Sequence, residues 1–264
     1  MERKVVFKAL VGSHNYNLNT GKVISNVTGD EFPPSDKDYK VFVLPTFEDL
    51  YKGNMYAHQT IGETEDNDIH DVRKLSDLFF KSNINFIEVL YSYEISFPDE
   101  LTQRQKELLS KLFYMRDEIV KMNLPHLFNA CGGMYLNKMK LLRKGTEGTQ
   151  HLVDAFGYDT KQALHAYRVL DFIVRFAQTD FKDFKSAITY NGKEREFMLE
   201  IKHGFFNVEA FENFVTFYHD ARFKTLKEVY HSHKPNFELK KEIDDVIMNL
   251  VKESIVWQKQ NIMI

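Results

Sequence analysis

The chain has 264 residues and a single cysteine, Cys131. A disulfide within the chain is therefore impossible, and a zinc site built from cysteines is not expected. With 12 Gly and 6 Pro, collagen-like and low-complexity sequences are excluded. No apolar run approaches the roughly 18 residues of a membrane span, and the N-terminal run, broken by Lys8, is unlike a signal peptide. We expect a soluble protein of the reducing cytoplasm, without a membrane partner.

The composition is that of a globular protein. Apolar residues make up 43% and charged residues 28%, a balance that excludes general disorder. The 23 Phe and 13 Tyr indicate a Phe-rich core. Lys plus Arg number 35 and Asp plus Glu number 38, so the net charge is 35 − 38 = −3. Binding to a nucleic acid would therefore need a local basic patch.

The first hundred residues contain short β-rich runs that end at turn residues. The pattern predicts three strands and a helix, at residues 4–11, 39–44, 66–72 and 73–81. A small hairpin is expected from residue 22 onward, across Gly29 and Asp30. From about residue 99 the apolar residues recur at helical spacing. Helices are predicted at residues 101–122, 160–178, 207–223 and 237–257.

The change of pattern falls near Pro98, which disfavours helix in the residue before it. We therefore predict an α+β fold in two domains. Residues 1–98 would form a mixed sheet with helices, and residues 99–264 a helical domain.

Gly12 and Ser13 end the first predicted strand. A turn of this kind between a strand and a helix can direct backbone N–H groups at an anion, and glycine permits close approach of a phosphate. A simple turn is the alternative interpretation.

Asp36 and Asp38 stand two residues apart where a strand begins. Strand side chains alternate between the faces, so both carboxylates should share one face and repel each other unless a cation lies between them. Oxygen ligands of this type suit Mg²⁺. The alternative is a solvated turn after the prolines at 33 and 34.

Four segments occur in a familiar order: GSHNYNLNT, SDKDYKVFVLP, HDVRKLSDLFFKSNINFIEVLYS and KQALHAYRVL. Together they resemble the DNA polymerase beta-like nucleotidyltransferase superfamily. More closely, they are similar to the predicted bacterial and phage nucleotidyltransferases of the RNA repair pathway polymerase-beta family. The resemblance covers roughly residues 4–175.

This resemblance implies a Mg²⁺-dependent nucleotidyltransferase. Such an enzyme moves a nucleoside monophosphate from a triphosphate, ATP for example, to a hydroxyl acceptor and releases pyrophosphate. Asp36 and Asp38 would hold two Mg²⁺ ions beside Gly12 and Ser13, and an acid before the HDVRKL segment would be the third ligand. We choose Asp68 for that position.

Asp66 is the close rival of Asp68, because period two places both on one strand face. The chain also departs from the family in two places. Asn17 stands where Gly is common, although Asn also tolerates positive φ. The segment 21–34 is longer than in many relatives, and it is interpreted as a lid or an extra hairpin.

A second group of candidate residues lies on the helix predicted at 160–178. Asp159 can cap this helix, with Gln162 as its capping-box partner. Lys161, His165 and Arg168 follow at helical spacing and form one polar stripe. The resemblance implies that this stripe binds the triphosphate as the helical domain closes over it. From spacing alone, a solvated face with ion pairs is favoured.

Other charged features have simpler interpretations. Arg73 and Lys74 can meet phosphate, but pairing with Asp71 and Asp77 is favoured. Four basic residues form the best candidate for a nucleic-acid contact, although a solvated helix surface is favoured: Lys138, Lys140, Arg143 and Lys144. Three histidines near Asp220 are a weak pattern for a metal site: His219, His231 and His233.

Two functions from different classes remain open. One is the active nucleotidyltransferase, whose acceptor is an RNA end, a protein hydroxyl or a small molecule. The acidic net charge favours addition of one or a few nucleotides over processive synthesis. The other is a catalytically silent nucleotide-binding or regulatory protein of a phage-defence or toxin–antitoxin system. The base and the oligomeric state are left open.

Overall fold

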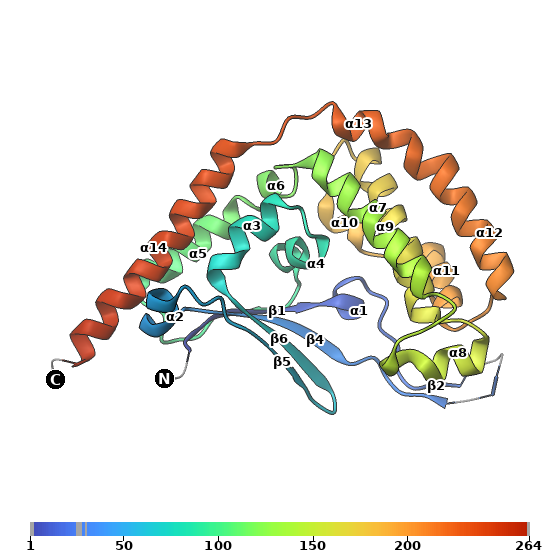
Figure 1. The fold of residues 1–264 in the computed structure, drawn as a ribbon, viewed down its shortest axis with the longest axis horizontal. Helices are drawn as coiled ribbons and strands as arrows, with labels where there is room; N and C mark the ends of the chain where they lie inside the picture. Colours follow the sequence, from blue (N-terminus) through green and yellow to red (C-terminus); the bar gives the residue numbers. More distant parts are fainter. Residues whose placement is uncertain (1–2, 25–27, 30, 263–264) are drawn as a thin grey trace. The chain divides into compact units, whose positions relative to one another are not determined.

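The computed structural model describes residues 3–24, 28–29 and 31–262, with the backbone alone for 256–262. The chain has a mixed α and β structure and forms two compact units. The first unit comprises Met1–Asn15, Asp36–Asn123 and Pro235–Ile264, and the second Tyr16–Ser35 and Leu124–Lys234. Figure 1 gives the position of each element along the chain. None of the helices described is long and apolar enough to cross a membrane.

The first unit is built on a five-stranded mixed sheet with the order β5-β6-β4-β1-β7. Its strands are β1 (Val5–Val11), β4 (Lys37–Val43), β5 (Ala57–Ile61), β6 (Glu65–Asp71) and β7 (Ile95–Ser96). β4 runs antiparallel to β1 and parallel to β6, and β5 and β7 form the two edges. This arrangement brings the end of β1 beside the start of β4.

Aromatic side chains attach helices to one face of this sheet. Phe7 of β1 stacks on Phe42 of β4 at 4.6 Å, and Phe113 meets Phe7 edge-on at 5.3 Å. The helices of the unit are α1 (Gly12–Asn15), α2 (Phe47–Lys52), α3 (Leu75–Phe80), α4 (Ile84–Ile87), α5 (Gln103–Tyr114), α6 (Arg116–Ile119) and α14 (Phe237–Ile262). The predicted Phe-rich core is thus confirmed in this unit.

The second unit is mainly helical. Its elements are β2 (Val23–Ile24), β3 (Glu31–Phe32), α7 (Leu124–Leu141), α8 (Gln150–Phe156), α9 (Thr160–Gln178), α10 (Phe184–Ile188), α11 (Gly192–Lys202), α12 (Val208–Tyr218) and α13 (Lys227–His231). α9 packs against α7 and α11 and buries most of its residues, Phe172 and Ile173 among them. α9 is therefore the central helix of this unit.

Most of the predicted elements are confirmed. The strands at 4–11, 39–44 and 66–72 correspond to β1, β4 and β6, and α9 has the predicted bounds. The hairpin from residue 22 is confirmed as the pair β2 and β3, although residues 25–27 and 30 lie outside those described. The helix predicted at 101–122 is wrong as one element. It breaks at Met115, which leaves helical geometry with ψ near 4°, into α5 and α6.

The division into units differs from the predicted boundary at residue 98. Helices α5 and α14 belong to the first unit, although both lie in the predicted second domain. They pack against each other, Lys111 of α5 pairs with Glu242 of α14 at 2.7 Å, and α14 also contacts α3. Conversely, Tyr16–Ser35 belongs to the helical unit. The chain therefore crosses between the units several times.

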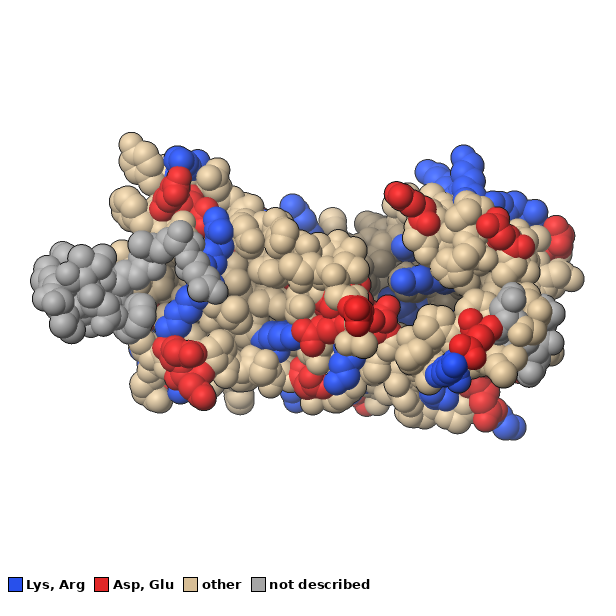
Figure 2. All heavy atoms as spheres, turned by 90° about the horizontal axis from the view of Figure 1, so that it is seen from below, with Lys and Arg blue, Asp and Glu red and all other residues tan. Residues whose placement is uncertain are grey.

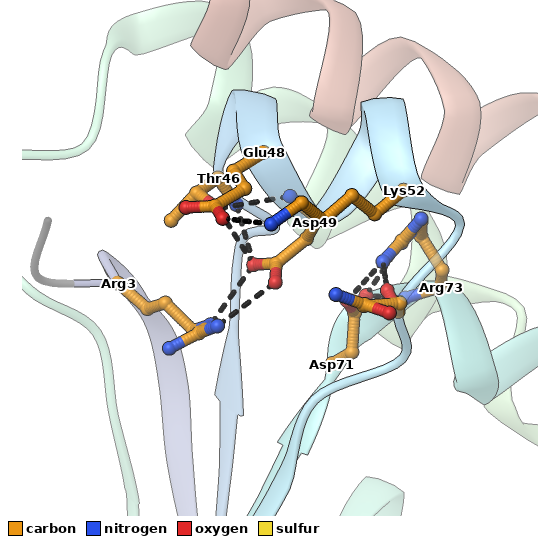
Figure 3. A network of polar contacts seen from close by, with 8 residues as sticks. Arg3, Thr46, Glu48, Asp49, Lys52, Asp71 and Arg73 are labelled. Carbon is orange, nitrogen blue, oxygen red and sulfur yellow. Dashed lines mark hydrogen bonds and ion pairs between the residues drawn. The ribbon is translucent and has the colours of Figure 1, made fainter.

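Two acid–arginine pairs hold the loops at one end of the sheet (Figure 3). Arg3 donates to both oxygens of Asp49 at 3.0 and 2.8 Å, and Asp49 also closes a capping box with Thr46 at the start of α2. These hydrogen bonds keep the pKa of Asp49 well below its ordinary value. Arg73 forms the second pair, with Asp71.

The Arg73 pair is a structural contact, as favoured by the sequence. Its guanidinium donates to both oxygens of Asp71 at 2.9 and 2.6 Å and also binds the carbonyl of Asn54. Asp77, the other predicted partner, pairs instead with Lys240 at 3.2 Å. The arginine is therefore already occupied by Asp71, which is fully buried.

Replacing Arg73 with Met is expected to lower the free energy of unfolding by about 3 kcal/mol, because it leaves the Asp71 carboxylate buried without its cation. Urea unfolding measures this loss. Lys74→Met, one residue along, is the control and should change stability little. A stable Arg73→Met protein with weakened nucleotide binding would contradict the structural role and indicate a phosphate contact.

Candidate active site

The helix-covered face of the sheet changes from apolar to acidic at the start of β4. Asp38 of β4 lies level with Asp66 of the parallel strand β6, and Lys40 lies level with Asp68. Side chains at paired positions on neighbouring strands share one face, and the strands are about 4.8 Å apart. Both Asp38 and Asp66 are half-buried. Two carboxylates are therefore held side by side at the end of the sheet.

The turn at Gly12 lies directly against Asp38. Val11 pairs with Asp38 across the ladder, and the chain turns at Gly12 with φ +68°. A β-carbon added at Gly12 would lie 2.7 Å from Asp38 Oδ2. The predicted neighbourhood of the Gly-Ser turn and the aspartate strand is thus confirmed for Asp38. Asp36 precedes β4 and is exposed, and Ser13 is half-buried in α1.

Glu88 lies buried behind the turn. Its Oε2 accepts hydrogen bonds from the Gly12 N–H at 3.2 Å and from Asn15 Nδ2 at 3.3 Å. The Gly12 N–H is therefore engaged by a buried carboxylate and is not available to a phosphate. Binding of a phosphate by the rest of the turn stays a prediction. The helix that follows adds little positive potential, because α1 is a single turn of four residues. The surroundings of the turn are acidic and suit a cation better than a bare anion.

Asp68, chosen from the sequence as the third ligand, is occupied by basic side chains. Its Oδ2 accepts from Lys40 Nζ at 2.7 Å, and His70 Nε2 lies 2.8 Å from its Oδ1. Burial raises the pKa of Asp68, but the contacts with Lys40 and His70 outweigh it and the pKa is lowered. Burial lowers the pKa of His70, so the ring is mostly neutral at pH 7. Among the described residues, Asp66 accepts a hydrogen bond only from the Gly62 N–H, at 3.2 Å, so the geometry favours the rival.

These residues fit a magnesium ion by the chemistry of their donors. Within the described ranges, no three His, Cys, Asp or Glu side chains converge tightly enough to hold an ion by themselves. Mg²⁺ does not require this, since it usually keeps waters and is bound by one or two carboxylates together with substrate phosphates. Asp38 and Asp66 provide two such carboxylates, and Asp36 lies two residues from Asp38. Their roles as ligands stay predictions.

In the second unit, the residues of the predicted stripe on α9 differ in burial. Lys161 is exposed, His165 is half-buried, and Arg168 is 3% exposed with its guanidinium 3.8 Å from the ring centre of Tyr16. The interpretation favoured from spacing alone, a solvated face with ion pairs, is therefore wrong for Arg168. The cap at Asp159 is confirmed through its bond from the Gln162 N–H at 3.0 Å. The reciprocal bond is not formed, because the Asp159 N–H donates to Leu142.

Basic side chains from three helices surround this stripe. Burial, Arg168, Lys138 and Lys161 all lower the pKa of His165 far below its ordinary value. Burial also lowers the pKa of Lys138 on α7. On α11, burial, Lys161 and Arg195 lower the pKa of Lys202 to about 8. We name this group the basic cluster: Lys138, Lys161, His165, Arg168, Arg195 and Lys202. Like charges gathered in this way favour binding of an anion.

Two members of the basic cluster also hold the segment that follows α1. Arg195 donates to the carbonyls of Asn17 and Asn19, and Lys202 Nζ donates to Leu18 O at 3.0 Å and Ser35 Oγ at 2.9 Å. Asn17 adopts φ 59°, so its expected tolerance of positive φ is confirmed. The segment predicted as an insertion is thus fastened at both ends within the second unit.

The remaining candidates are structural where their contacts are described. Arg143 pairs with Glu212 at 2.6 Å and Glu209 at 3.3 Å, in line with the favoured solvated surface. His219 lies 3.0 Å from Asp220, but within the described ranges no three His, Cys, Asp or Glu side chains come together there to hold a metal. Cys131 is fully buried, and burial raises the pKa of its thiol to about 12.

A scan against protein-family models finds no match, and a search of the curated proteins finds none. The likeness to polymerase beta-like nucleotidyltransferases therefore stays a prediction that depends on the residues themselves.

Sequence reasoning missed Glu88, Arg195 and Lys202, and it placed Lys138 in a different candidate site. Glu88 lies among apolar residues of the NFIEVL segment, and only its burial beside Gly12 marks it. Lys138 was assigned to a surface patch, and Lys202 was not considered. No sequence signal distinguishes Lys138 and Lys202 from the other lysines, because their proximity to α9 depends on how three helices pack.

Proposed function

We propose that the protein is a Mg²⁺-dependent nucleotidyltransferase with Asp38 and Asp66 as its principal metal-binding carboxylates. The observation that carries this proposal is the position of Asp38, level with Asp66 and directly against the Gly12 turn. This keeps two acids together beside a turn whose glycine allows the Asp38 carboxylate to lie directly against the backbone. Asp36, near the start of the same strand, completes the acidic group.

In the proposed reaction, the acceptor oxygen forms a bond to the α-phosphorus of a nucleoside triphosphate. The bond from this phosphorus to its bridging oxygen breaks, pyrophosphate leaves with the electron pair, and the hydroxyl proton passes to solvent. A bound Mg²⁺ would neutralise charge on the phosphate oxygens during the transfer. Ser13 offers a hydroxyl donor to phosphate. Glu88 acts as a positioning residue, because its carboxylate accepts a hydrogen bond from the Gly12 N–H and so fixes the turn.

The basic cluster supports binding of a polyphosphate by the second unit. Lys161 is exposed and Lys138 is half-buried, so these two ammonium groups are its most accessible donors. Burial is the main cause of the lowered pKa of His165 and Lys202, and repulsion from neighbouring basic groups adds to it; a bound anion would relieve that repulsion. We therefore propose that the cluster binds a polyphosphate anion. Closure of the helical region over the nucleotide stays a prediction.

A short or small acceptor is favoured over a long polynucleotide. On the face drawn in Figure 2, basic and acidic side chains lie in small groups of both signs, without an extended basic area. Tracking of a long phosphate backbone requires many Lys and Arg contacts. We propose the transfer of one or a few nucleotides, with an RNA end among the candidate acceptors.

The test uses the same triphosphate labelled at either the α- or the γ-phosphate, with Mg²⁺ and a panel of short RNAs, proteins and small hydroxyl compounds. Transfer of the α-label with release of the γ-label in pyrophosphate would support the proposal. Transfer of the γ-label would indicate a kinase. Triphosphate binding without turnover on any acceptor would favour the silent regulatory protein.

The pH dependence of nucleotide binding tests the role of Lys202. Because its pKa is about 8, the ammonium is charged at pH 7.5 and loses its proton as the pH rises toward 9.5. The Kd for ATP without metal should therefore increase on the order of tenfold across this range. Lys202→Met should bind more weakly at pH 7.5 and lack this step. Identical pH profiles for the two proteins would contradict the assignment.

A further inference from the structure

β5 is an edge strand without the features that usually protect an edge. Natural edges are blocked by charged residues, proline, bulges or short length. β5 contains only Ala, His, Gln, Thr and Ile, all five residues are exposed, and its register with β6 is unbroken. The opposite edge, β7, has two residues and is followed by Pro98. In Figure 1, β5 lies at the margin of the sheet.

The hydrogen bonds at both ends of β5 show which of its backbone groups face outward. Asp71 N donates to Tyr56 O, and Gly62 N donates to Glu65 O. Bonded and non-bonded pairs alternate in an antiparallel ladder, so even-numbered residues of this strand bond to β6. The N–H and C=O groups of Ala57, Gln59 and Ile61 therefore point away from β6. Within the described part of the chain, these groups have no hydrogen-bond partner.

We propose that β5 pairs with β5 of a second copy of this chain, antiparallel and centred on Gln59. In this register, Gln59 pairs with Gln59 of the second copy and Ala57 pairs with Ile61, so every outward backbone group of the three residues finds a partner. Ile61, which is 79% exposed, then packs on Ala57. On the other face, His58 lies opposite Thr60.

The distribution of charge favours a second copy over another peptide. The paired strands bring no Asp, Glu, Lys or Arg directly against a like charge, because residues 57–61 carry none. The acidic strand β6 of each copy lies one strand further away. With strands about 4.8 Å apart, the two acidic strands are then about 14 Å apart, beyond the Debye length at physiological salt. The two-fold axis would run perpendicular to the sheet and leave Asp38 and Asp66 of both copies on the same side.

Sedimentation of the full chain across a wide concentration range tests the pairing. The wild type is expected to form a weak, concentration-dependent dimer, since two short strands make a small interface. Gln59→Pro removes an outward N–H that the bond to β6 does not use, and edge strands tolerate proline. It should weaken the dimer at least about tenfold, which corresponds to about 1.4 kcal/mol, with little change in thermal stability. Gln59→Val keeps the N–H and is the matched control.

Cysteine trapping tests the register without relying on proline. His58 of one copy should lie opposite Thr60 of the other, in a non-hydrogen-bonded pair with Cα atoms about 4.5 Å apart, within disulfide range. An equimolar mixture of His58→Cys and Thr60→Cys should give a covalent dimer under mild oxidation, and each variant alone should not. Cys131 is buried and should not take part.

Three results would overturn the proposal. The first is a wild-type protein that stays monomeric at high concentration, together with cysteine variants that form no disulfide-linked dimer. The second is a dimer that Gln59→Pro leaves intact, and the third is equal disulfide formation in the single variants and in the mixture. The transfer assay is a separate readout. A monomer that transfers nucleotides would refute the pairing alone.

Discussion

Replacing Asp38 with Asn is expected to reduce nucleotidyl transfer by about 10³-fold, or about 4 kcal/mol in the barrier. The substitution keeps the size of the side chain but removes a charged oxygen from the site beside Gly12. Thermal unfolding should change little, because Asp38 is only half-buried. Initial rates with an α-labelled triphosphate, together with unfolding curves, measure both effects.

The two rival carboxylates on β6 supply the matched comparison. Asp66→Asn should cause a loss similar to that of Asp38→Asn, because the two residues lie level on adjacent strands. Asp68→Asn should lower the rate of transfer by less than about tenfold, since Asp68 already neutralises Lys40. Its main effect should be a lower unfolding temperature. A large rate loss in Asp68→Asn with full activity in Asp66→Asn would restore the ligand chosen from the sequence.

Gly12→Ala is the second substitution with a large expected effect. Its β-carbon would lie 2.7 Å from Asp38 Oδ2, so the carboxylate must move, and the positive φ adds about 1–2 kcal/mol of strain. We expect transfer to fall by about 10²-fold, because a small displacement at a reacting centre is costly. Rates and the free energy of unfolding of the purified variant measure both consequences.

Gly53→Ala separates strain from displacement. Gly53 also has φ +68°, but a β-carbon there meets no other atom within 4 Å. It should lose similar stability through backbone strain and keep its activity. If the two alanine variants have equal activity, the contact between the turn and Asp38 has no part in the reaction.

The regular strands and the amphipathic helices were predictable from local sequence. β1 and β4 are rich in β-branched and aromatic residues and lie between turn residues, and α9 has apolar residues at helical spacing after a capping Asp159. In these segments local preference and tertiary packing agree, so the pattern is sufficient. The neighbourhood of Gly12 and Asp38 was also predictable, because one ends a strand and the other begins its partner.

Elements with weak patterns were missed. β5 is short, polar and exposed on every residue, so no alternation marks it. α7 packs against both α9 and α13 and lacks a single apolar stripe, and Gly132 and Gly133 stand in its middle. Within α7, a β-carbon added at Gly132 would lie 3.2 Å from the ring of Phe223.

The choice between Asp66 and Asp68 depended on strand register. Both residues share one face of β6, as the period of two predicted, but only the pairing with β4 places Asp66 beside Asp38 and Asp68 beside Lys40. Register between strands almost 30 residues apart is a tertiary property that a single sequence does not reveal. The return of α14 to the first unit is of the same kind.

Crystals soaked with Mn²⁺ and a non-hydrolysable nucleoside triphosphate would test the central claim most directly, since anomalous scattering locates the metal. We predict a metal about 2.0–2.2 Å from carboxylate oxygens of Asp38 and Asp66, with phosphate oxygens completing its ligands beside Gly12. A metal bound elsewhere, or a nucleotide bound without contact to Asp38, would contradict the account.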